Sequence, residues 1–338
     1  MIRTLTDLAK ATGLSKSTVS RALAGNPVIA IETRRRVAEL ATQHGFQINQ
    51  TARALRIGKA QAIGVVLPLG HETGQHPSDP FFITMVGHLA DALTDRGQDL
   101  LLSRVIPADD GWLDRIVASG RTDGIIIIGQ SDQGAIIDRV AARHRPLVVW
   151  GAHLPGQSYC SVGTDNLRGG ALATTHLLAA GRRQLVFYGN PKVPEIGLRL
   201  EGHANASAEA GLGVRMVPVP MTPEAAYAMI AADLAQGAPI DGIVAASDTI
   251  AMMAIRALAE RNQSVPGDVA VVGYDDVTLA AHTNPPLTTV RQDLKQGADR
   301  LVDLLFRRMA GEDTESVILP PELVVRGSSH DGCATLPG

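Results

Sequence analysis

The sequence predicts an α/β protein with a small helix-turn-helix domain at its N-terminus and a body of two doubly wound parallel-sheet subdomains. The chain has 338 residues, more than one hydrophobic core usually supports. Residues 1–60 carry ten Lys or Arg and three Asp or Glu side chains, although the whole chain has a formal charge of −3. Beyond residue 61, short runs of Val, Ile and Leu alternate with amphipathic segments, which is typical of parallel sheets covered by helices on both faces.

The composition indicates a globular protein of a reducing compartment. Aromatic residues make up only 3% of the chain, so the core has to be built from Ala, Val, Leu and Ile. The sequence holds no apolar run long enough to span a membrane, and Met1–Asp7 lacks the apolar stretch of a secretion signal. Cys160 and Cys333 are the only cysteines, which argues against a disulfide framework or a cysteine metal site. We therefore expect a cytoplasmic protein that holds no metal and no cofactor.

Residues 1–46 predict the helix-turn-helix domain, with a third helix completing it. Thr4 and Asp7 have the spacing of a capping box at the start of the first helix. Gly13 ends that helix, Ser15 begins the second, and the third extends over residues 32–44. Each helix has one apolar face. The residues expected to be buried are Leu5, Leu8, Ala9, Val19, Ala22, Leu23, Val37, Leu40 and Ala41.

The second of these helices exposes short polar and basic side chains. Lys16 and Ser17 lie at its start, and Ser20 and Arg21 follow one turn later. Such a helix suits the major groove of DNA, where an arginine can bind guanine through two hydrogen bonds. The positive charge of this end of the chain fits a polyanionic partner. A three-helix packing module with a solvated face explains the same pattern, so both interpretations stay open at this point.

Four stretches of the sequence carry a more specific signal. They read Thr-Asp-Leu-Ala-Lys-Ala at 6–11, Leu-Ser-Lys-Ser-Thr-Val-Ser-Arg-Ala-Leu at 14–23, Glu-Thr-Arg-Arg-Arg-Val at 32–37 and Asn-Gln-Thr-Ala-Arg-Ala-Leu-Arg at 49–56. This series resembles the head of the LacI/GalR family of bacterial transcriptional regulators, and the similarity continues nearly to the C-terminus. One departure is Ala30, where the family usually has a Ser or Thr that caps the third helix. The resemblance implies contacts to DNA from Thr4, Ser15, Lys16, Ser17, Thr18, Ser20, Arg21, Arg34, Asn49, Arg53, Leu55 and Arg56.

Residues 47–60 are the expected hinge. Leu55 is apolar and stands between Arg53 and Arg56, in a stretch too short to be stable as an isolated helix. The resemblance implies that this stretch folds on operator DNA. Leu55 from each subunit of a homodimer would then wedge into a minor-groove base step of a pseudo-palindromic site. A flexible basic linker is the alternative for the alanines of the stretch.

The body is expected over residues 61–330. Its N-terminal subdomain would comprise about 61–160 and 291–320, and its C-terminal subdomain about 161–290 and 321–330. The apolar runs and the final extended segment predict its strands. The expected strands are Ala62–Leu67, Asp99–Ser103, Gly124–Gly129, Pro146–Gly151, Gln184–Gly189, Val214–Val219, Asp241–Ala246, Val269–Tyr274 and Glu322–Arg326.

A ligand cleft is expected between the two subdomains, because doubly wound sheets bind ligands at the carboxyl ends of their strands. The family's body is similar to periplasmic sugar-binding proteins, which agrees with this expectation. Phe82 lies in Asp-Pro-Phe-Phe, similar to the family's Asn-Pro-Phe-Phe, where an aromatic ring packs on the effector. Arg199 matches the family's pocket arginine, and Asp248 matches an acid that binds a hydroxyl. A carboxylate and an arginine together can hold vicinal hydroxyls.

Three further residues are candidate effector contacts. Asp275 follows an expected strand and is equally explained as a helix cap. Asp165 opens a helix, and we favour a capping role for it. His71 belongs to the loop 68–78, which is longer than the family usually has and lines the pocket mouth in relatives. A solvated loop is the alternative for His71.

These observations favour a regulator over an enzyme or a transport protein. The sequence lacks a G-x-G-x-x-G after a strand, a Walker motif, a G-x-S-x-G and a zinc-ligand cluster. A periplasmic binding protein would leave the basic head unexplained. The resemblance implies a repressor whose operator affinity is switched by a small molecule, with a sugar favoured over a purine. A non-sugar effector, transcriptional activation and a body that binds no effector stay open.

Overall fold

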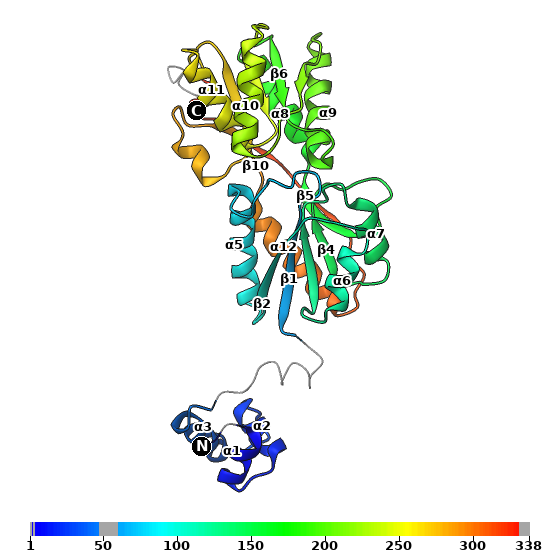
Figure 1. Ribbon diagram of the computed structural model, residues 1–338, viewed down its shortest axis with the longest axis vertical. Coiled ribbons are helices and arrows are strands. Elements are labelled where there is room, and N and C mark those ends of the chain that lie inside the picture. Colours follow the sequence, from blue (N-terminus) through cyan, green and yellow to red (C-terminus); the bar gives the residue numbers. More distant parts are fainter. Residues whose placement is uncertain (1, 3, 47–59, 331–338) are drawn as a thin grey trace. The chain divides into compact units, whose positions relative to one another are not determined.

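The computed structural model describes residues 2, 4–46 and 60–330. The chain divides into two compact units between Ala60 and Gln61. Among the described residues the first unit is entirely helical, and the strands all belong to the second (Figure 1).

Three helices form the first unit: α1 (Leu5–Thr12), α2 (Lys16–Leu23) and α3 (Ile31–Gln43). The predicted capping box at Thr4 is confirmed, and Gly13 ends α1 in the left-handed conformation with φ of 68°. The apolar faces meet in one small core, as the helical spacing predicts. Its buried residues are Leu8, Ala9, Val19, Ala22, Val37 and Ala41, against which Leu5, Leu23 and Leu40 pack.

The second unit contains two sheets of six strands. The strands of the first sheet are β1 (Ala62–Pro68), β2 (Asp99–Val105), β3 (Gly124–Ile128), β4 (Leu147–Trp150), β5 (Cys160–Thr164) and β11 (Val317–Leu319). They lie in the order β11-β5-β4-β3-β1-β2, and their pairs are parallel. Ile63 on β1 is paired with Leu100 on one side and Gly124 on the other.

Helices cover both faces of the first sheet (Figure 1). They are α5 (Pro80–Thr94), α6 (Trp112–Ala118), α7 (Gly134–Ala141) and α12 (Leu294–Met309). Alternate strand residues point to opposite faces. Val65 therefore packs with α5 and α12, whereas Val66 packs with α6 and α7.

The second sheet has the order β12-β10-β9-β8-β6-β7, with β12 antiparallel to β10 and the other pairs parallel. Its strands are β6 (Leu185–Tyr188), β7 (Met216–Val217), β8 (Gly242–Ala245), β9 (Ala270–Asp275), β10 (Thr288–Arg291) and β12 (Glu322–Val324). Here α8 packs against α9 and α10 against α11. These helices are α8 (Asn166–Ala179), α9 (Pro194–Glu209), α10 (Pro223–Ala235) and α11 (Asp248–Glu260). The α/β class and the two doubly wound sheets are as predicted.

Two strands of the first sheet, β5 and β11, were not expected from the sequence, and neither was β10 of the second sheet. β5 interrupts its apolar residues with Ser161 and Gly163, so it lacks the continuous aliphatic run that indicates a buried strand. Because β5 pairs with β4, the first sheet extends to Thr164, beyond the boundary expected near residue 160. β7 is the opposite case, since only two residues of the expected run at 214–219 are paired.

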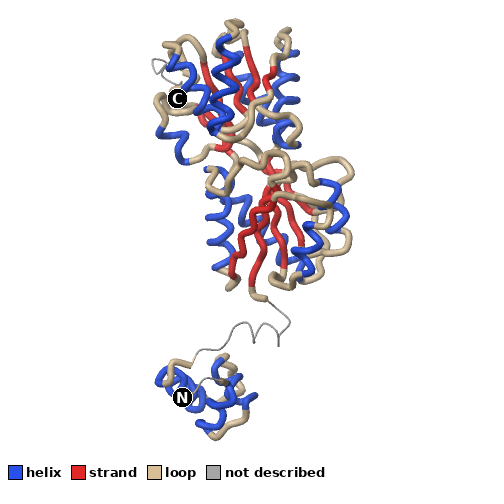
Figure 2. The backbone as a smooth tube through the Cα atoms, in the orientation of Figure 1, coloured by secondary structure: helices blue, strands red, loops and turns tan. Residues whose placement is uncertain are grey.

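The chain passes between the two sheets three times: after β5, after β10 and between β11 and β12. Figure 2 shows the two sets of strands meeting where these segments cross. The carboxyl ends of strands from both sheets consequently face one junction. That junction holds the cavity described next.

Candidate functional site

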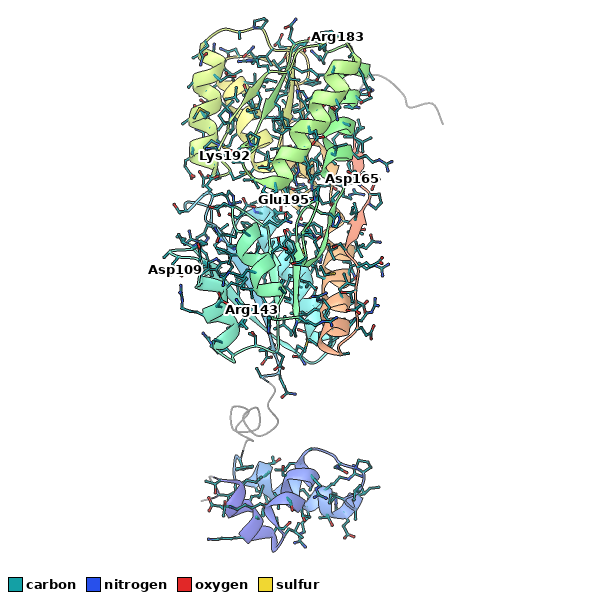
Figure 3. All side chains as sticks on the ribbon, turned by 90° about the vertical axis from the view of Figure 1, so that its right-hand side faces the viewer. Asp109, Arg143, Asp165, Arg183, Lys192 and Glu195 are labelled. Carbon is teal, nitrogen blue, oxygen red and sulfur yellow. The ribbon has the colours of Figure 1, made fainter. Side chains whose placement is uncertain are left out.

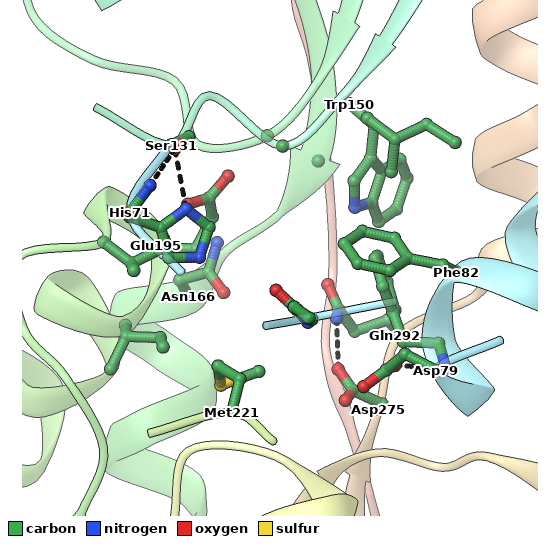
Figure 4. A pocket seen from close by; sticks show the side chains of 18 of the residues that line it. His71, Asp79, Phe82, Ser131, Trp150, Asn166, Glu195, Met221, Asp275 and Gln292 are labelled. Carbon is green, nitrogen blue, oxygen red and sulfur yellow. Dashed lines mark hydrogen bonds between the residues drawn. The ribbon is translucent and has the colours of Figure 1, made fainter. Parts of the chain in front are cut away.

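A cavity of about 730 Å³, its open mouth included, lies between the two sheets. The segments that follow β1, β3 and β4 form one side of it. The start of α9 and the end of β9 form the other (Figure 4). This is the place where paired doubly wound subdomains bind ligands.

Part of the cavity wall is aromatic. Phe82 on α5 and Trp150 at the end of β4 lie beside each other in Figure 4, and both are buried. Phe81 packs edge-on against Phe82, with ring centroids 5.5 Å apart. Phe82, a residue predicted from the sequence, is thus part of the cavity wall. Ring faces of this kind can pack against the C–H groups of a sugar or against a flat base.

Arg199 on α9 reaches the cavity, and other parts of the chain hold its guanidinium. Its Nε donates to Oδ1 of Asn166 at 2.8 Å, and its Nη1 donates to the carbonyl of Ala246 at 2.6 Å. Its Cζ lies 3.7 Å from the centroid of the Tyr274 ring. The positive charge is therefore fixed in direction before any ligand arrives. Arg199 also has a structural role, because Asn166 and Ala246 depend on it for these bonds.

Two glycines set the position of Arg199 by allowing α8 and α9 to approach closely. A Cβ on Gly170 of α8 would lie 1.9 Å from the carbonyl oxygen of Arg199, and a Cβ on Gly202 of α9 would lie 1.9 Å from that of Leu167. Any side chain at either position would push the helices apart. The sequence therefore builds this side of the cavity on backbone contact between two helices.

Asp275 is the last residue of β9 and lines the cavity. Its backbone has φ of 120°, a conformation that is rare for a residue with a side chain. Its Oδ1 accepts a hydrogen bond from Nε2 of Gln292 at 2.7 Å. Burial raises the pKa of Asp275 to about 7, although the nearby Arg199 acts in the opposite direction. This carboxyl group can therefore titrate near neutral pH.

Asp248, which the sequence predicted as a ligand contact, does not line this cavity. It is fully buried, and both carboxylate oxygens are engaged within the chain. Oδ2 accepts from the backbone N–H of Val277 at 2.9 Å, and Oδ1 accepts from the hydroxyl of Thr289 at 2.5 Å. The prediction has to be corrected: Asp248 fixes the segment after β9 and thereby supports Asp275. Burial raises the pKa of Asp248, and the neighbouring Asp275 adds to this rise.

A polar cluster forms another part of the cavity. Nδ1 of His71 lies 2.6 Å from the hydroxyl of Ser131, so the predicted residue His71 lines the cavity rather than a solvated loop. Burial lowers the pKa of His71, and the carboxylates of Glu195 and Glu72 oppose this change only in part. His71 is consequently neutral near pH 7. Oε2 of Glu195 is buried and has no hydrogen-bond partner among the described residues, which marks it as an acceptor that a ligand could satisfy.

Asp165 caps α8, as favoured from the sequence: its Oδ1 accepts from the N–H of Arg168 at 3.0 Å. It does not line the main cavity. Figure 3 shows Asp165 and Glu195 near the level where the two sheets meet. Glu195 was not singled out from the sequence, and neither were most of the other residues that line the cavity. Five of them are notable for a charged, amide or aromatic side chain: Asp79, Trp150, Asn166, Glu195 and Gln292.

The sequence could have indicated most of these five residues as ligand contacts, because they lie at strand ends or directly after them. Trp150 ends β4, Asn166 follows β5 after one intervening residue, and Gln292 follows β10 directly. Glu195 gave no such signal. It sits in the first turn of α9, and only the fold brings it opposite the end of β3.

In the helical unit, most of the predicted DNA contacts have exposed or partly exposed side chains, and one of them, Arg34, holds two parts of the domain together. Ser15 caps α2, and its hydroxyl bonds those of Ser17 and Thr18, each at 2.8 Å. Lys16 and Arg21 are exposed on the same helix. Thr4 and Ser20 are also at least partly exposed. These side chains can therefore reach a partner surface without unfolding the domain.

Arg34 is only partly exposed and has a bracing role. Its Nη1 donates to the carbonyl of Gly25 at 3.0 Å, which ties α3 to the turn that follows α2. Ala30 provides no side-chain cap for α3, as the sequence indicated. The remaining predicted contacts lie outside the described residues. They are Asn49, Arg53, Leu55 and Arg56.

Two kinds of feature are absent from the described part of the chain. No helix there is long and apolar enough to cross a bilayer. No three His, Cys, Asp or Glu side chains in these ranges come together as metal ligands.

Known proteins match the chain along almost its whole length. Residues 4–49 match the model of bacterial regulatory proteins of the lacI family, and residues 174–329 match a periplasmic binding protein-like domain. The transcriptional regulator AglR of Rhizobium meliloti is 30% identical over 336 residues, covering 96% of this chain and 94% of AglR. CelR of Thermobifida fusca is 29% identical over 334 residues, covering 96% and 98%.

Solved structures give the same result. A complex of the regulator CelR with cellobiose has a TM-score of 0.69 and 27% identity, covering 97% of this chain and all of that one. The Lac repressor dimer bound to operator and an anti-inducer has a TM-score of 0.84 and covers 97% and 99%; at 24% identity it supports the fold. With its helix-turn-helix head, its paired parallel sheets and a relative this similar over nearly its full length, the chain belongs to the LacI family of bacterial transcriptional regulators.

Proposed function

We propose that the protein is a homodimeric repressor that binds a pseudo-palindromic operator and is released from it by an uncharged saccharide in the body cavity. The chemistry of the cavity carries this proposal. Phe82 and Trp150 offer ring faces to C–H groups, while Glu195 and Asp275 offer acceptors to hydroxyl groups. The two halves of the proposal, DNA binding and sugar sensing, can be tested separately.

The charges that line the cavity disfavour an anionic effector. Asp79, Glu195 and Asp275 are acidic, whereas Arg199 is the only Lys or Arg among the described lining residues. Burial raises the pKa of Asp79, which indicates that its charge is poorly compensated. A sugar phosphate would add negative charge to this group. The cellobiose complex of CelR gives independent support for a neutral saccharide.

Exposed apolar side chains on the body support a dimer. Ile83 on α5 is 55% exposed, and Leu102 on the neighbouring β2 is 40% exposed. Apolar side chains that neighbouring elements expose can belong to a protein interface. The Lac repressor is a dimer on its operator, and a symmetric dimer would present two heads to two half-sites.

For the DNA half, we infer that Lys16, Ser17 and Arg21 of α2 contact bases or phosphates, with Thr4, Ser15, Thr18 and Ser20 positioning the helix. Their exposure at the start of a capped helix supports this assignment. Arg34 would act chiefly by bracing the domain. Contacts from Asn49, Arg53, Leu55 and Arg56 rest on the family resemblance.

The direct test is to find the operator and then the effector. Genomic fragments that the purified protein retains are sequenced, and the best site is labelled for fluorescence anisotropy. Neutral mono- and disaccharides, including cellobiose, are then added alongside sugar phosphates and purine bases. Release by a neutral saccharide is the expected result. Release only by a purine or a phosphate would contradict the sugar assignment, and tighter binding on addition of effector would contradict induction.

Replacement of Glu195 by Gln tests the cavity itself. The change keeps the shape but removes a charged acceptor, so we expect the identified effector to bind about tenfold more weakly, or about 1.4 kcal/mol. Operator affinity without effector should stay within about twofold. Glu201→Gln, an exposed change on the same helix, is the matched control and should alter neither quantity. Equal effector affinity in Glu195→Gln and wild type would remove Glu195 from the site.

A further inference from the structure

The loop between β1 and α5 contacts the opposite subdomain through one carboxylate. Oε2 of Glu72 accepts from the backbone N–H of Met221 at 2.7 Å, and Oε1 accepts from that of Thr222 at 3.0 Å. Glu72 follows a strand of the first sheet, whereas Thr222 is the N-cap of α10, which packs with the second sheet. Both oxygens of a single side chain therefore bridge the two halves of the body.

The carboxylate oxygens of Glu72 are well suited to the start of α10. Thr222 makes no side-chain cap of its own, and α10 begins with Pro223, which has no N–H to bond. The start of a helix carries partial positive charge and attracts a carboxylate. Hydrogen bonds to a charged acceptor are also stronger than those between neutral groups. The contact thus satisfies the N–H groups of the N-cap residue and of the residue before it, with an acceptor from the other subdomain.

The loop that carries Glu72 is held firmly and also lines the cavity. Arg104 of β2 donates to the carbonyl oxygens of Thr73, at 2.5 Å, and of Gln75, at 3.2 Å. Gln75 is buried, and it lines the cavity together with His71. Met221, whose N–H bonds Glu72, lines the cavity as well. The same segment therefore forms a wall of the cavity and spans its two sides.

We propose that Glu72 is a latch that holds the two subdomains closed over the cavity, and that breaking its two hydrogen bonds sets how readily the cavity opens. This inference rests on the proposed function only in taking the effector as the molecule that enters the cavity. If it does, the strength of the two Glu72 hydrogen bonds sets the rates of effector binding and release. A stronger latch slows entry and release of the effector, and a weaker one speeds both.

Hydrogen exchange of the two amides tests the latch directly. Residues 218, 220 and 223 are all proline, so a peptide over residues 218–223 reports only the amides of Val219, Met221 and Thr222. In the full-length protein, Glu72→Ala is expected to accelerate exchange of this peptide by about tenfold. Glu72→Gln, which retains one neutral acceptor, should fall between Glu72→Ala and wild type. Glu224→Gln removes an exposed charge from the first turn of α10 and serves as the matched control. It should leave exchange unchanged.

Opening of the cavity is measured through Trp150, which is 4% exposed in the cavity wall. Trp112 is the only other tryptophan, so a Trp112→Phe background isolates the signal. Adding Glu72→Ala to this background should at least double the acrylamide quenching constant of Trp150, while Glu224→Gln should not change it.

Unchanged exchange at 218–223 in Glu72→Ala would overturn the proposal. Faster exchange without increased quenching would also overturn it, because Glu72 would then bond the residues at the start of α10 without holding the cavity closed. Acceleration spread over all peptides of α10 and α11 would indicate lost packing and count against a latch. These measurements use neither DNA nor effector, so their failure is distinguishable from failure of the operator and effector experiments.

Discussion

Asp275 combines two features that are unfavourable for a carboxylate in isolation. Its backbone is in a conformation that costs free energy, and its side chain is buried with an amide as its hydrogen-bond donor. Asp248 beneath it carries a second buried carboxyl group, held by Thr289 and Val277. Burial therefore opposes the ionisation of both carboxyl groups, and pH should affect the stability of the folded protein.

We expect Asp275→Asn to stabilise the protein at high pH but not at low pH. The folded-state pKa of about 7 lies above the ordinary value of 3.8, so ionisation of Asp275 disfavours the folded state. This cost is absent below about pH 4, grows as pH rises towards 7, and is then constant. Asn keeps an acceptor for Gln292 and tolerates positive φ. Thermal midpoints of variant and wild type should coincide near pH 4.5 and differ by several degrees at pH 8. A difference independent of pH would contradict this pKa.

At this scale the sequence predicted residue types better than residue roles. The sequence indicated both Asp248 and Asp275 as candidate contacts, and only the hydrogen bonds from Val277 and Thr289 to Asp248 separate their roles. Glu195 shows the limit most clearly. Its relation to Gln130 spans 65 residues of sequence, and no local pattern encodes that proximity.

Among the elements, α8 and α9 determine the site most directly. Their close approach at Gly170 and Gly202 places Arg199 beside Asn166. Helix amphipathicity predicts that such helices exist and which face is buried. It does not predict how near they come, because the separation depends on which small residues oppose each other. β5 shows a related limit, since a short strand with Ser and Gly is recognised only through its pairing.

Gly202→Ala should destabilise the body, because the added methyl group would meet the carbonyl oxygen of Leu167. Overpacking of this kind costs about 1–3 kcal/mol, and the midpoint of thermal unfolding should fall by several degrees. Gly87→Ala in α5 is the control. Its Cβ would meet nothing within 4 Å, so the better helix propensity of Ala should raise stability by about 0.5–1 kcal/mol. If Gly202→Ala changed the midpoint of thermal unfolding as Gly87→Ala does, α8 and α9 would be able to move apart at little cost in free energy.

In the whole molecule, the part proposed to bind DNA and the part proposed to bind the effector carry charges of opposite sign. The first sixty residues are strongly basic, whereas the Asp, Glu, Lys and Arg side chains that line the cavity are three acids and one buried arginine. DNA binding and effector binding should therefore respond differently to salt. The composition already indicated this division, although the site that uses the acidic part became clear only from the fold.

Raising KCl from 50 to 200 mM should weaken operator binding by on the order of 10³, because counterions released from the phosphates favour binding at low salt. Affinity for a neutral effector should change less than about twofold over the same range, since no net charge enters the cavity. Anisotropy titrations with operator, and calorimetry with effector, provide the two measurements. An operator affinity that is insensitive to salt would contradict binding through the basic head, and a steep salt dependence of effector binding would contradict an uncharged ligand.

The three passages between the sheets have a consequence for how the body can come apart. Neither subdomain is a continuous piece of chain, so one protease cut in any passage leaves the halves joined by two others. A singly nicked body should keep its size in gel filtration and run as two fragments only after denaturation. The three segments between the sheets are thus redundant covalent tethers, and the two halves can move against each other repeatedly while staying joined.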